Sequence, residues 1–225
     1  MRGASRVCVI EDHTLFAESL QIALELKGHE VRRVTLPDDL HSATTLLPAV
    51  MKHQPHVLLL DLDLGNADGS RLIEPVARAG TAVVVLTGST DRARWGQCVR
   101  LGARKVMEKT APLNEILSTI RLIGEGRPVM TVEEREDLVR HWQEERAQVA
   151  ELLDRLNRLT AREAEVLGQL MNGRQVRQIA EESVVSEATV RTQVKSILAK
   201  LEVSSQIGAV GLAHNAGWMP PAART

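Results

Sequence analysis

The first 127 residues alternate between two hydrophobic periodicities. Short apolar runs typical of strands occupy residues 6–11, 29–36, 56–64, 81–88 and 103–109. Each run is followed by a segment whose apolar residues recur every three or four positions, as in an amphipathic helix. Five repeats of strand then helix predict an α/β domain, a doubly wound, five-stranded parallel sheet covered by helices on both faces.

A different pattern follows Gly126 and Pro128, because residues 131–159 contain neither glycine nor proline. Alternate steps of four and three residues along this stretch meet apolar side chains at all but one position. The positions are Leu138, Trp142, Glu145, Val149, Leu152, Leu156 and Leu159. A seam this narrow favours contact between two helices. Residues 128–158 are therefore expected to form a long linker helix, with self-association as one interpretation and a helix resting on its own domain as the other.

Residues 159–218 have the pattern of a compact, all-α unit of four helices. Thr160 and Glu163 form a capping box before the first helix, and Gly173 is its natural stop. Ser186 is placed to cap a helix over residues 187–201. The remaining residues, 219–225, are expected to form a flexible tail.

Composition adds few constraints beyond those patterns. The chain has 225 residues, of which 44% are hydrophobic and 25% charged, as in ordinary globular proteins. Cys8 and Cys98 are widely separated, which favours a reducing, cytoplasmic location without a disulfide framework. No run reaches the roughly 18 apolar residues that would indicate a membrane span, so no membrane partner is expected.

Polar residues end four of the predicted strands. Glu11 and Asp12 follow the first, Asp61 and Asp63 the third, Thr87 the fourth and Lys109 the fifth. Because ligands bind beyond the carboxyl ends of such strands, these side chains are expected to meet at one edge. Crowded carboxylates repel one another, and a hard divalent ion such as Mg²⁺ relieves that repulsion. A carboxylate in such a site can attack a phosphoryl group, whereas the simpler alternative is a solvated acidic turn.

With these residues, positions 5–126 resemble the receiver domain of two-component response regulators. The resemblance implies that a sensor histidine kinase or a small phosphodonor phosphorylates Asp61 in a Mg²⁺-dependent step. The implied metal ligands are Glu11, Asp12, Asp61 and the backbone carbonyl of Asp63, and the implied phosphoryl-sensing residues are Thr87 and Lys109.

The sequence departs from the receiver pattern at two positions. Gly65 stands where the family usually has proline, and Val106 stands where it has an aromatic switch residue. A transcription factor that is not controlled by phosphorylation is therefore an alternative. A more remote one is a haloacid-dehalogenase-like phosphatase that uses Asp61 and Asp63, although that motif normally opens its domain.

The helix predicted over residues 187–201 has two different faces. Val190, Val194, Ile197 and Leu201 form an apolar stripe, while Arg191, Thr192 and Lys195 lie on or beside the opposite face. Seven Lys and Arg against six Asp and Glu in residues 159–225 give no overall basic field. This local cationic patch suits insertion into a DNA major groove, and a plain helical bundle is the alternative.

Residues 159–218 resemble the LuxR-type helix-turn-helix domain, and the segments that carry the resemblance are LTAREAEVL and IAEESVVSEATVRTQVKSILAKL. The resemblance implies base contacts by Arg191, Thr192 and Lys195. The weaker candidates for phosphate contact are Arg177, Thr189, Gln193 and Lys200. Together the two resemblances identify the chain as a NarL/FixJ-class transcriptional regulator, not an enzyme, which is expected to bind promoter half-sites as a homodimer.

Overall fold

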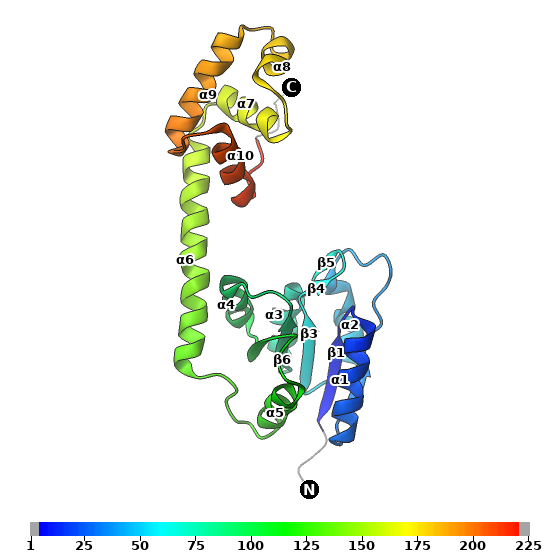
Figure 1. The fold of residues 1–225 in the computed structure, drawn as a ribbon. Coiled ribbons are helices and arrows are strands. Elements are labelled where there is room, and N and C mark those ends of the chain that lie inside the picture. Colours follow the sequence, from blue (N-terminus) through cyan, green and yellow to red (C-terminus); the bar gives the residue numbers. More distant parts are fainter. Residues whose placement is uncertain (1–4, 221–225) are drawn as a thin grey trace. The chain divides into compact units, whose positions relative to one another are not determined.

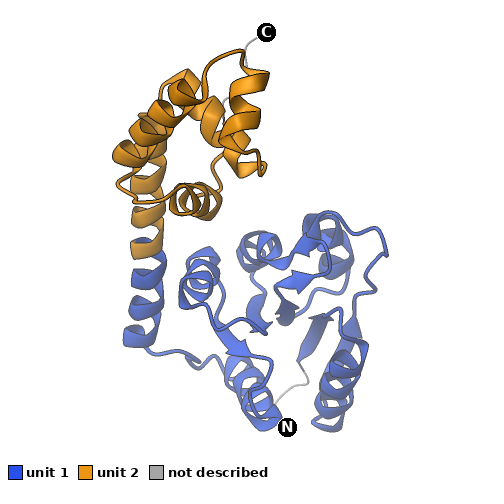
Figure 2. Cartoon of the chain, turned by 45° about the horizontal axis from the view of Figure 1, so that its top comes forward, with its two compact units in different colours: residues 1–143 blue, residues 144–225 orange. Residues whose placement is uncertain are grey.

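The computed structural model of the protein describes residues 5–220. The chain divides after Gln143 into two compact units, and the division falls inside one long helix, α6 (Val132–Asn157) (Figure 2). No helix among the described residues is both long and apolar enough to cross a lipid bilayer.

The first unit contains the predicted parallel sheet, with strand order β2-β1-β3-β6-β7 (Figure 1). Its strands are β1 (Arg6–Ile10), β2 (Glu30–Arg33), β3 (Val57–Asp61), β6 (Ala82–Thr87) and β7 (Lys105–Glu108). Every residue of β3 and β6 is buried, which confirms that these apolar runs form central strands.

Helices cover both faces of this sheet, as the doubly wound pattern predicts. Alternate side chains of β1, β3 and β6 pack on one face against α1 (Thr14–Leu26) and α5 (Leu113–Gly124). The other face packs against α2 (Leu47–Lys52), α3 (Ile73–Arg78) and α4 (Arg92–Leu101). Two 3-10 turns, η1 (Ala43–Leu46) and η2 (Gly69–Leu72), precede α2 and α3.

A short hairpin follows β3, which the sequence pattern did not predict. Its strands are β4 (Asp63–Leu64) and β5 (Ala67–Asp68). Gly65 lies in the connecting turn with φ +63°. Proline holds φ near −65°, so the proline usual in receivers could not adopt this backbone. The hairpin therefore accounts for Gly65.

The second unit contains the predicted four helices after the end of α6. They are α7 (Ala161–Met171), α8 (Val176–Glu182), α9 (Glu187–Leu201) and α10 (Gln206–Asn215). The capping box of Thr160 and Glu163 and the Ser186 cap of α9 are both present. The apolar stripe of α9 is buried in the core of this unit, as projected.

The C-terminal tail is not wholly loose, contrary to prediction. A Cβ added to Gly168 of α7 would lie 2.7 Å from Cγ of Pro220, so Pro220 packs against this helix. Residues 221–225 of the expected tail lie outside the described residues.

Helix α6 uses its apolar seam within its own chain. Leu138 is 2% exposed and lies in the core of the first unit, whereas Leu156 is 1% exposed in the core of the second. The linker is therefore shared by the two units, and the seam is already occupied at both ends. Self-association through the remaining positions of the seam stays a prediction.

Candidate functional site

Asp61, Glu11 and Lys109 meet at the carboxyl edge of the sheet. The Lys109 ammonium donates hydrogen bonds of 2.7 Å to Asp61 Oδ2 and of 2.7 Å to Glu11 Oε1. Asp61 is 1% exposed. Burial raises the pKa of Asp61 to about 6, since it outweighs the opposing hydrogen bond from Lys109. The predicted convergence of strands β1, β3 and β7 on one edge is thus present.

Asp12 and His13 complete this acidic cluster. One side-chain ligand atom each from Glu11, Asp12, His13 and Asp61 lies within 4.8 Å of the others. His13 was not predicted, although its place next to Asp12 in the sequence was the available signal. Its Nδ1 lies 2.7 Å from Asp12 Oδ1 and 3.1 Å from Glu11 Oε1. Three close carboxylates give a set of hard oxygen donors, which fits a divalent cation such as Mg²⁺.

Asp63 has a different environment from Asp61. Its backbone N–H donates to Asp61 Oδ1 at 3.1 Å, while its carboxylate accepts two hydrogen bonds from Arg94 of α4, at 2.7 and 3.3 Å. Arg94 is 31 positions away in the sequence, and nothing in the local pattern indicated this pair. The side chain of Asp63 is thus turned to α4, and its backbone to the acidic site.

Thr87 ends β6, the strand next to β3, and is fully buried. Its hydroxyl oxygen accepts a hydrogen bond of 3.1 Å from the backbone N–H of Ser89, and its carbonyl accepts one of 2.8 Å from the backbone N–H of Lys109. These bonds fix the start of the loop that leads to α4.

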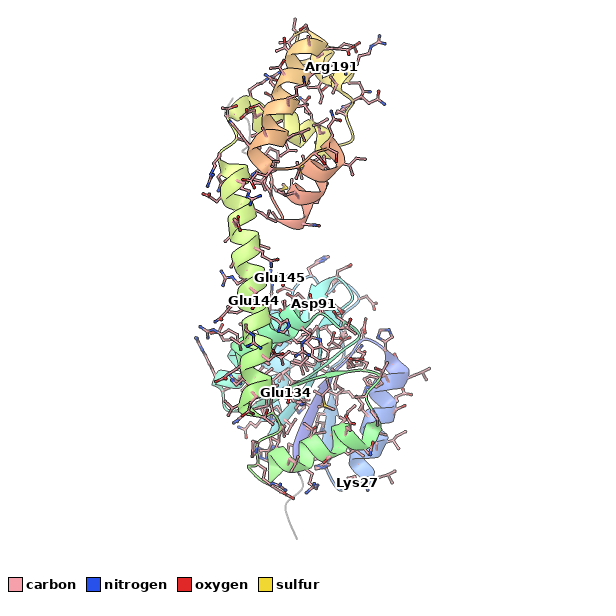
Figure 3. The ribbon with its side chains drawn as sticks, turned by 60° about the vertical axis from the view of Figure 1, so that its left-hand side comes forward. Lys27, Asp91, Glu134, Glu144, Glu145 and Arg191 are labelled. Carbon is pink, nitrogen blue, oxygen red and sulfur yellow. The ribbon has the colours of Figure 1, made fainter. Side chains whose placement is uncertain are left out.

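Helix α9 exposes the three residues predicted to face DNA bases. Arg191, Thr192 and Lys195 are all exposed, and Figure 3 labels Arg191 on this helix. The Arg191 guanidinium donates 2.9 Å to Glu187, one turn earlier, and the Thr192 hydroxyl donates 2.9 Å to the carbonyl of Ala188. The structure thus provides a solvent-exposed, partly neutralised cationic face.

The four candidates for phosphate contact differ in availability. Arg177 is 77% exposed and pairs with Glu181, and Thr189 is exposed and shares a hydrogen bond with Ser186. The amide oxygen of Gln193 is buried. Lys200 donates 2.7 Å to Glu163 and 3.3 Å to the carbonyl of Arg158, so it serves the interior of the domain, which weakens its assignment to phosphate.

Glu163 is a buried anion that the capping box alone did not reveal. Although burial opposes its charge, hydrogen bonds from Lys200, Ser196 and Thr160 lower the pKa of Glu163 to about 2. This carboxylate therefore joins the start of α7 to the second half of α9.

Two protein families match the chain at these two sites. Residues 7–121 match the response regulator receiver domain, and residues 157–213 match the luxR family of bacterial regulatory proteins. The first match contains the acidic edge and the second contains α9, which favours a receiver over the phosphatase alternative.

Relatives resemble the chain over most of its length. The probable transcriptional regulatory protein NarL of Mycobacterium tuberculosis H37Rv is 32% identical over 207 residues, which are 91% of each chain. The transcriptional regulatory protein DesR of Bacillus subtilis is 28% identical over 169 residues, which cover 75% of this chain and 78% of DesR.

Similarity in fold extends to solved structures. RcsB of Salmonella enterica serovar Typhimurium aligns with a TM-score of 0.50 and 22% identity, over 93% of this chain and 98% of that one. A LuxR-family regulator from Aurantimonas sp. aligns with a TM-score of 0.51 and 19% identity, over 64% of this chain and 99% of that one. With the two family matches and the identity to NarL, the chain belongs to the response regulators that join a receiver domain to a LuxR-type DNA-binding domain.

Proposed function

We propose that the protein is a phosphorylation-controlled transcriptional regulator whose phosphoacceptor is Asp61. The observation that carries this proposal is the buried carboxylate of Asp61 beside Glu11, with Lys109 bound to both. A pKa of about 6 leaves most of this carboxylate ionised near neutral pH, so it keeps the lone pair that a nucleophile needs.

The proposed step transfers a phosphoryl group from a donor to Asp61. One Oδ atom of Asp61 forms a bond to phosphorus, while the bond from phosphorus to the donor's histidine nitrogen or acyl oxygen breaks and the donor leaves with its electron pair. The Lys109 ammonium and the Thr87 hydroxyl would hold the transferred oxygens. Glu11, Asp12, Asp61 and the backbone carbonyl of Asp63 would hold a Mg²⁺ ion. When bound, this ion supplies positive charge that offsets the charge of the phosphoryl oxygens.

The second unit is proposed to place α9 in the major groove of promoter DNA. Arg191, Thr192 and Lys195 would contact base edges, and the exposed Arg177 and Thr189 would contact phosphates. The unit has little net charge, so two copies on paired half-sites would supply the affinity that one copy lacks. We further propose that a sensor histidine kinase is the phosphodonor, that the protein acts as a homodimer and that it works in the cytoplasm.

A transcription factor that is not controlled by phosphorylation remains the second candidate. It is favoured by Val106, which is 3% exposed within the core of the first unit. A buried aliphatic side chain at this position provides no aromatic ring to swing between an inward and an outward state.

Acetyl phosphate with Mg²⁺ distinguishes the two candidates. The wild type should incorporate acid-labile phosphate, Asp61→Asn should incorporate none, and Asp68→Asn, a carboxylate in the neighbouring hairpin, should behave as the wild type. Incorporation that leaves DNA affinity unchanged would favour the second candidate, and incorporation in Asp61→Asn would refute the assignment of the phosphoacceptor.

DNA selected from a random library by the purified protein tests α9 in a mobility-shift assay. Arg191→Ala and Lys195→Ala should each weaken specific binding by about 10-fold or more, as expected for the loss of a good base contact. Arg158→Ala, which removes an exposed arginine from the loop before α7, is the matched control. Equal affinity in all three variants would exclude α9 as the recognition helix.

A further inference from the structure

The first part of the linker helix, Val132–Gln143 of α6, packs on α4 at an unusually close approach. A Cβ added to Gly96 of α4 would lie 2.0 Å from the carbonyl oxygen of Leu138 and 2.9 Å from Cβ of Trp142. The side chain of Leu138 enters the core formed with Cys98 and Val99. Since real Cβ atoms do not approach a backbone so closely, only glycine at position 96 allows this contact.

Polar contacts surround this close approach. Arg92 of α4 pairs with Asp137 at 2.5 Å, and Lys105 of β7 pairs with Glu134 at 2.7 Å. Figure 3 labels Glu134 on the part of α6 that belongs to the first unit. The first part of the linker helix therefore packs specifically on the surface formed by α4 and β7 and covers it.

The N-terminal part of α4 is hydrogen-bonded to two residues that adjoin the acidic site, Asp63 and Ser89. Arg94 donates two hydrogen bonds to the carboxylate of Asp63, whose backbone N–H bonds to Asp61. The indole of Trp95 donates 2.9 Å to the carbonyl of Ser89, and the backbone N–H of Ser89 bonds to the Thr87 hydroxyl. Two short hydrogen-bonded routes thus join the proposed phosphoryl site to α4, and neither involves Val106.

We propose that Arg94 is a positioning residue that couples the acidic site to the docking of α6 on α4. A phosphoryl group carries more negative charge than the carboxylate it modifies, so it competes with Asp63 for the Arg94 guanidinium. Arg94 and Gly96 both belong to α4, and the close packing at Gly96 leaves this helix little room to adjust. Movement of Arg94 therefore disturbs the contact between Gly96 and Leu138 of α6. This role rests on the proposed function only in taking a phosphoryl group as the signal.

Hydrogen exchange of residues 132–143 in the full-length protein tests the coupling without any phosphodonor. Arg94→Gln removes the charged pair and should speed exchange in this segment at least several-fold. Arg100→Gln is the matched control, since Arg100 is an exposed arginine of the same helix without an ion pair among the described residues. Arg94→Lys, which keeps the charge, should restore part of the protection.

Gly96→Ala provides the reference for an undocked helix, because the added methyl group collides with Leu138. Gly211→Ala, at a helical glycine of α10 with open space around it, is its control. The coupling is overturned if exchange in Arg94→Gln equals that of the wild type while Gly96→Ala exchanges faster. It is equally overturned if Arg100→Gln speeds exchange as much as Arg94→Gln.

Beryllofluoride with Mg²⁺ then tests the signal. In a Trp218→Phe background, the fluorescence of Trp95 and Trp142 should change on addition in the otherwise unaltered protein and stay constant in Arg94→Gln. Phosphate incorporation from acetyl phosphate is measured separately on both proteins. If neither protein incorporates phosphate, the proposed function is refuted, whereas the hydrogen-exchange result decides the coupling independently. An equal fluorescence change in both proteins would contradict the role of Arg94.

Discussion

At the scale of single residues, burial of Asp61 lowers the stability of the folded protein near neutral pH. The pKa of Asp61 is raised from 3.8 to about 6 mainly by desolvation, so the folded state binds a proton more tightly than the unfolded chain. Stability is then greatest while the group is protonated and falls as pH rises from about 4 through 6. Asp61 is expected to destabilise the apo-protein at neutral pH.

The substitution Asp61→Asn should therefore stabilise the first unit, and more so at higher pH. A pKa shift of this size corresponds to an upper limit of about 3 kcal/mol, so a gain on the order of 1–3 kcal/mol is expected at pH 8 and little gain at pH 4. Thermal unfolding with a chelator present, at both pH values, measures it. Asp68→Asn serves as the control, and a gain that is equal at pH 4 and pH 8 would contradict this account.

Ionisation of Glu163 has the opposite effect on stability, because its pKa in the folded state lies below its pKa in the unfolded chain. The folded value of about 2 compares with 4.5, so its contribution is present above pH 4.5 and is lost as pH falls through about 2. Glu163→Gln should cost the second unit on the order of 1–3 kcal/mol at pH 7, and the difference from wild type should shrink below pH 4. Urea unfolding followed through the buried Trp218 measures it. A cost that is independent of pH would show that packing, not charge, sets the effect.

The sequence indicated these residues to different degrees. Glu11, Asp61 and Lys109 were predictable because the carboxyl ends of parallel strands must share one edge. The Asp63–Arg94 pair was not, since it depends on how a helix 31 positions away is rotated about its axis. The hydrogen bond of Lys200 to Glu163 was not predictable either, because Glu163 belongs to another helix.

At the scale of elements, short-range signals predicted most boundaries and long-range packing decided the rest. The capping box before α7 and the Ser186 cap of α9 involve residues three positions apart, so the sequence contains all of each signal. The apolar seam of α6 was equally clear, but periodicity does not say which surface covers it. The need for glycine at position 96 arises from the packing of α6 against α4, which no local pattern indicates.

The turn between α8 and α9 contains a strained residue that suggests a stabilising change. Val184 has φ +54° and is 92% exposed, at a position after α8 where glycine is the usual helix stop. A β-branched side chain is disfavoured in this left-handed region. Val184→Gly relieves this strain and should raise the unfolding free energy of the second unit by about 1 kcal/mol. The extra conformational entropy that glycine gives the unfolded chain offsets part of this gain.

Chemical unfolding of the full-length protein, followed through Trp218, checks this gain. Val185→Gly, at the neighbouring position without a positive φ, should lower stability instead. If both variants lower the unfolding free energy, the packing of Val184 stabilises the turn by more than its backbone strain costs.

At the scale of the whole molecule, the proposed function combines two subunits that each bind DNA weakly. Several cations of the second unit are paired with acids of the same unit, as Arg191 is with Glu187 and Arg177 with Glu181. These pairs are exposed and individually weak, yet each must be exchanged for a DNA contact. One unit alone should therefore bind DNA weakly, and tight binding should require two subunits held at a fixed spacing.

The spacing of half-sites tests this requirement directly. In a DNA site selected by the full-length protein, inserting about five base pairs between the half-sites rotates one by half a helical turn. Affinity should then fall to that of a single half-site, because two linked subunits can no longer reach both faces. Insertion of about ten base pairs restores the rotation and should restore part of the affinity. Titration by fluorescence anisotropy at fixed salt measures all three sites, and equal affinity for them would show that the protein binds each half-site as a monomer, with the linker helix serving only the coupling within one chain.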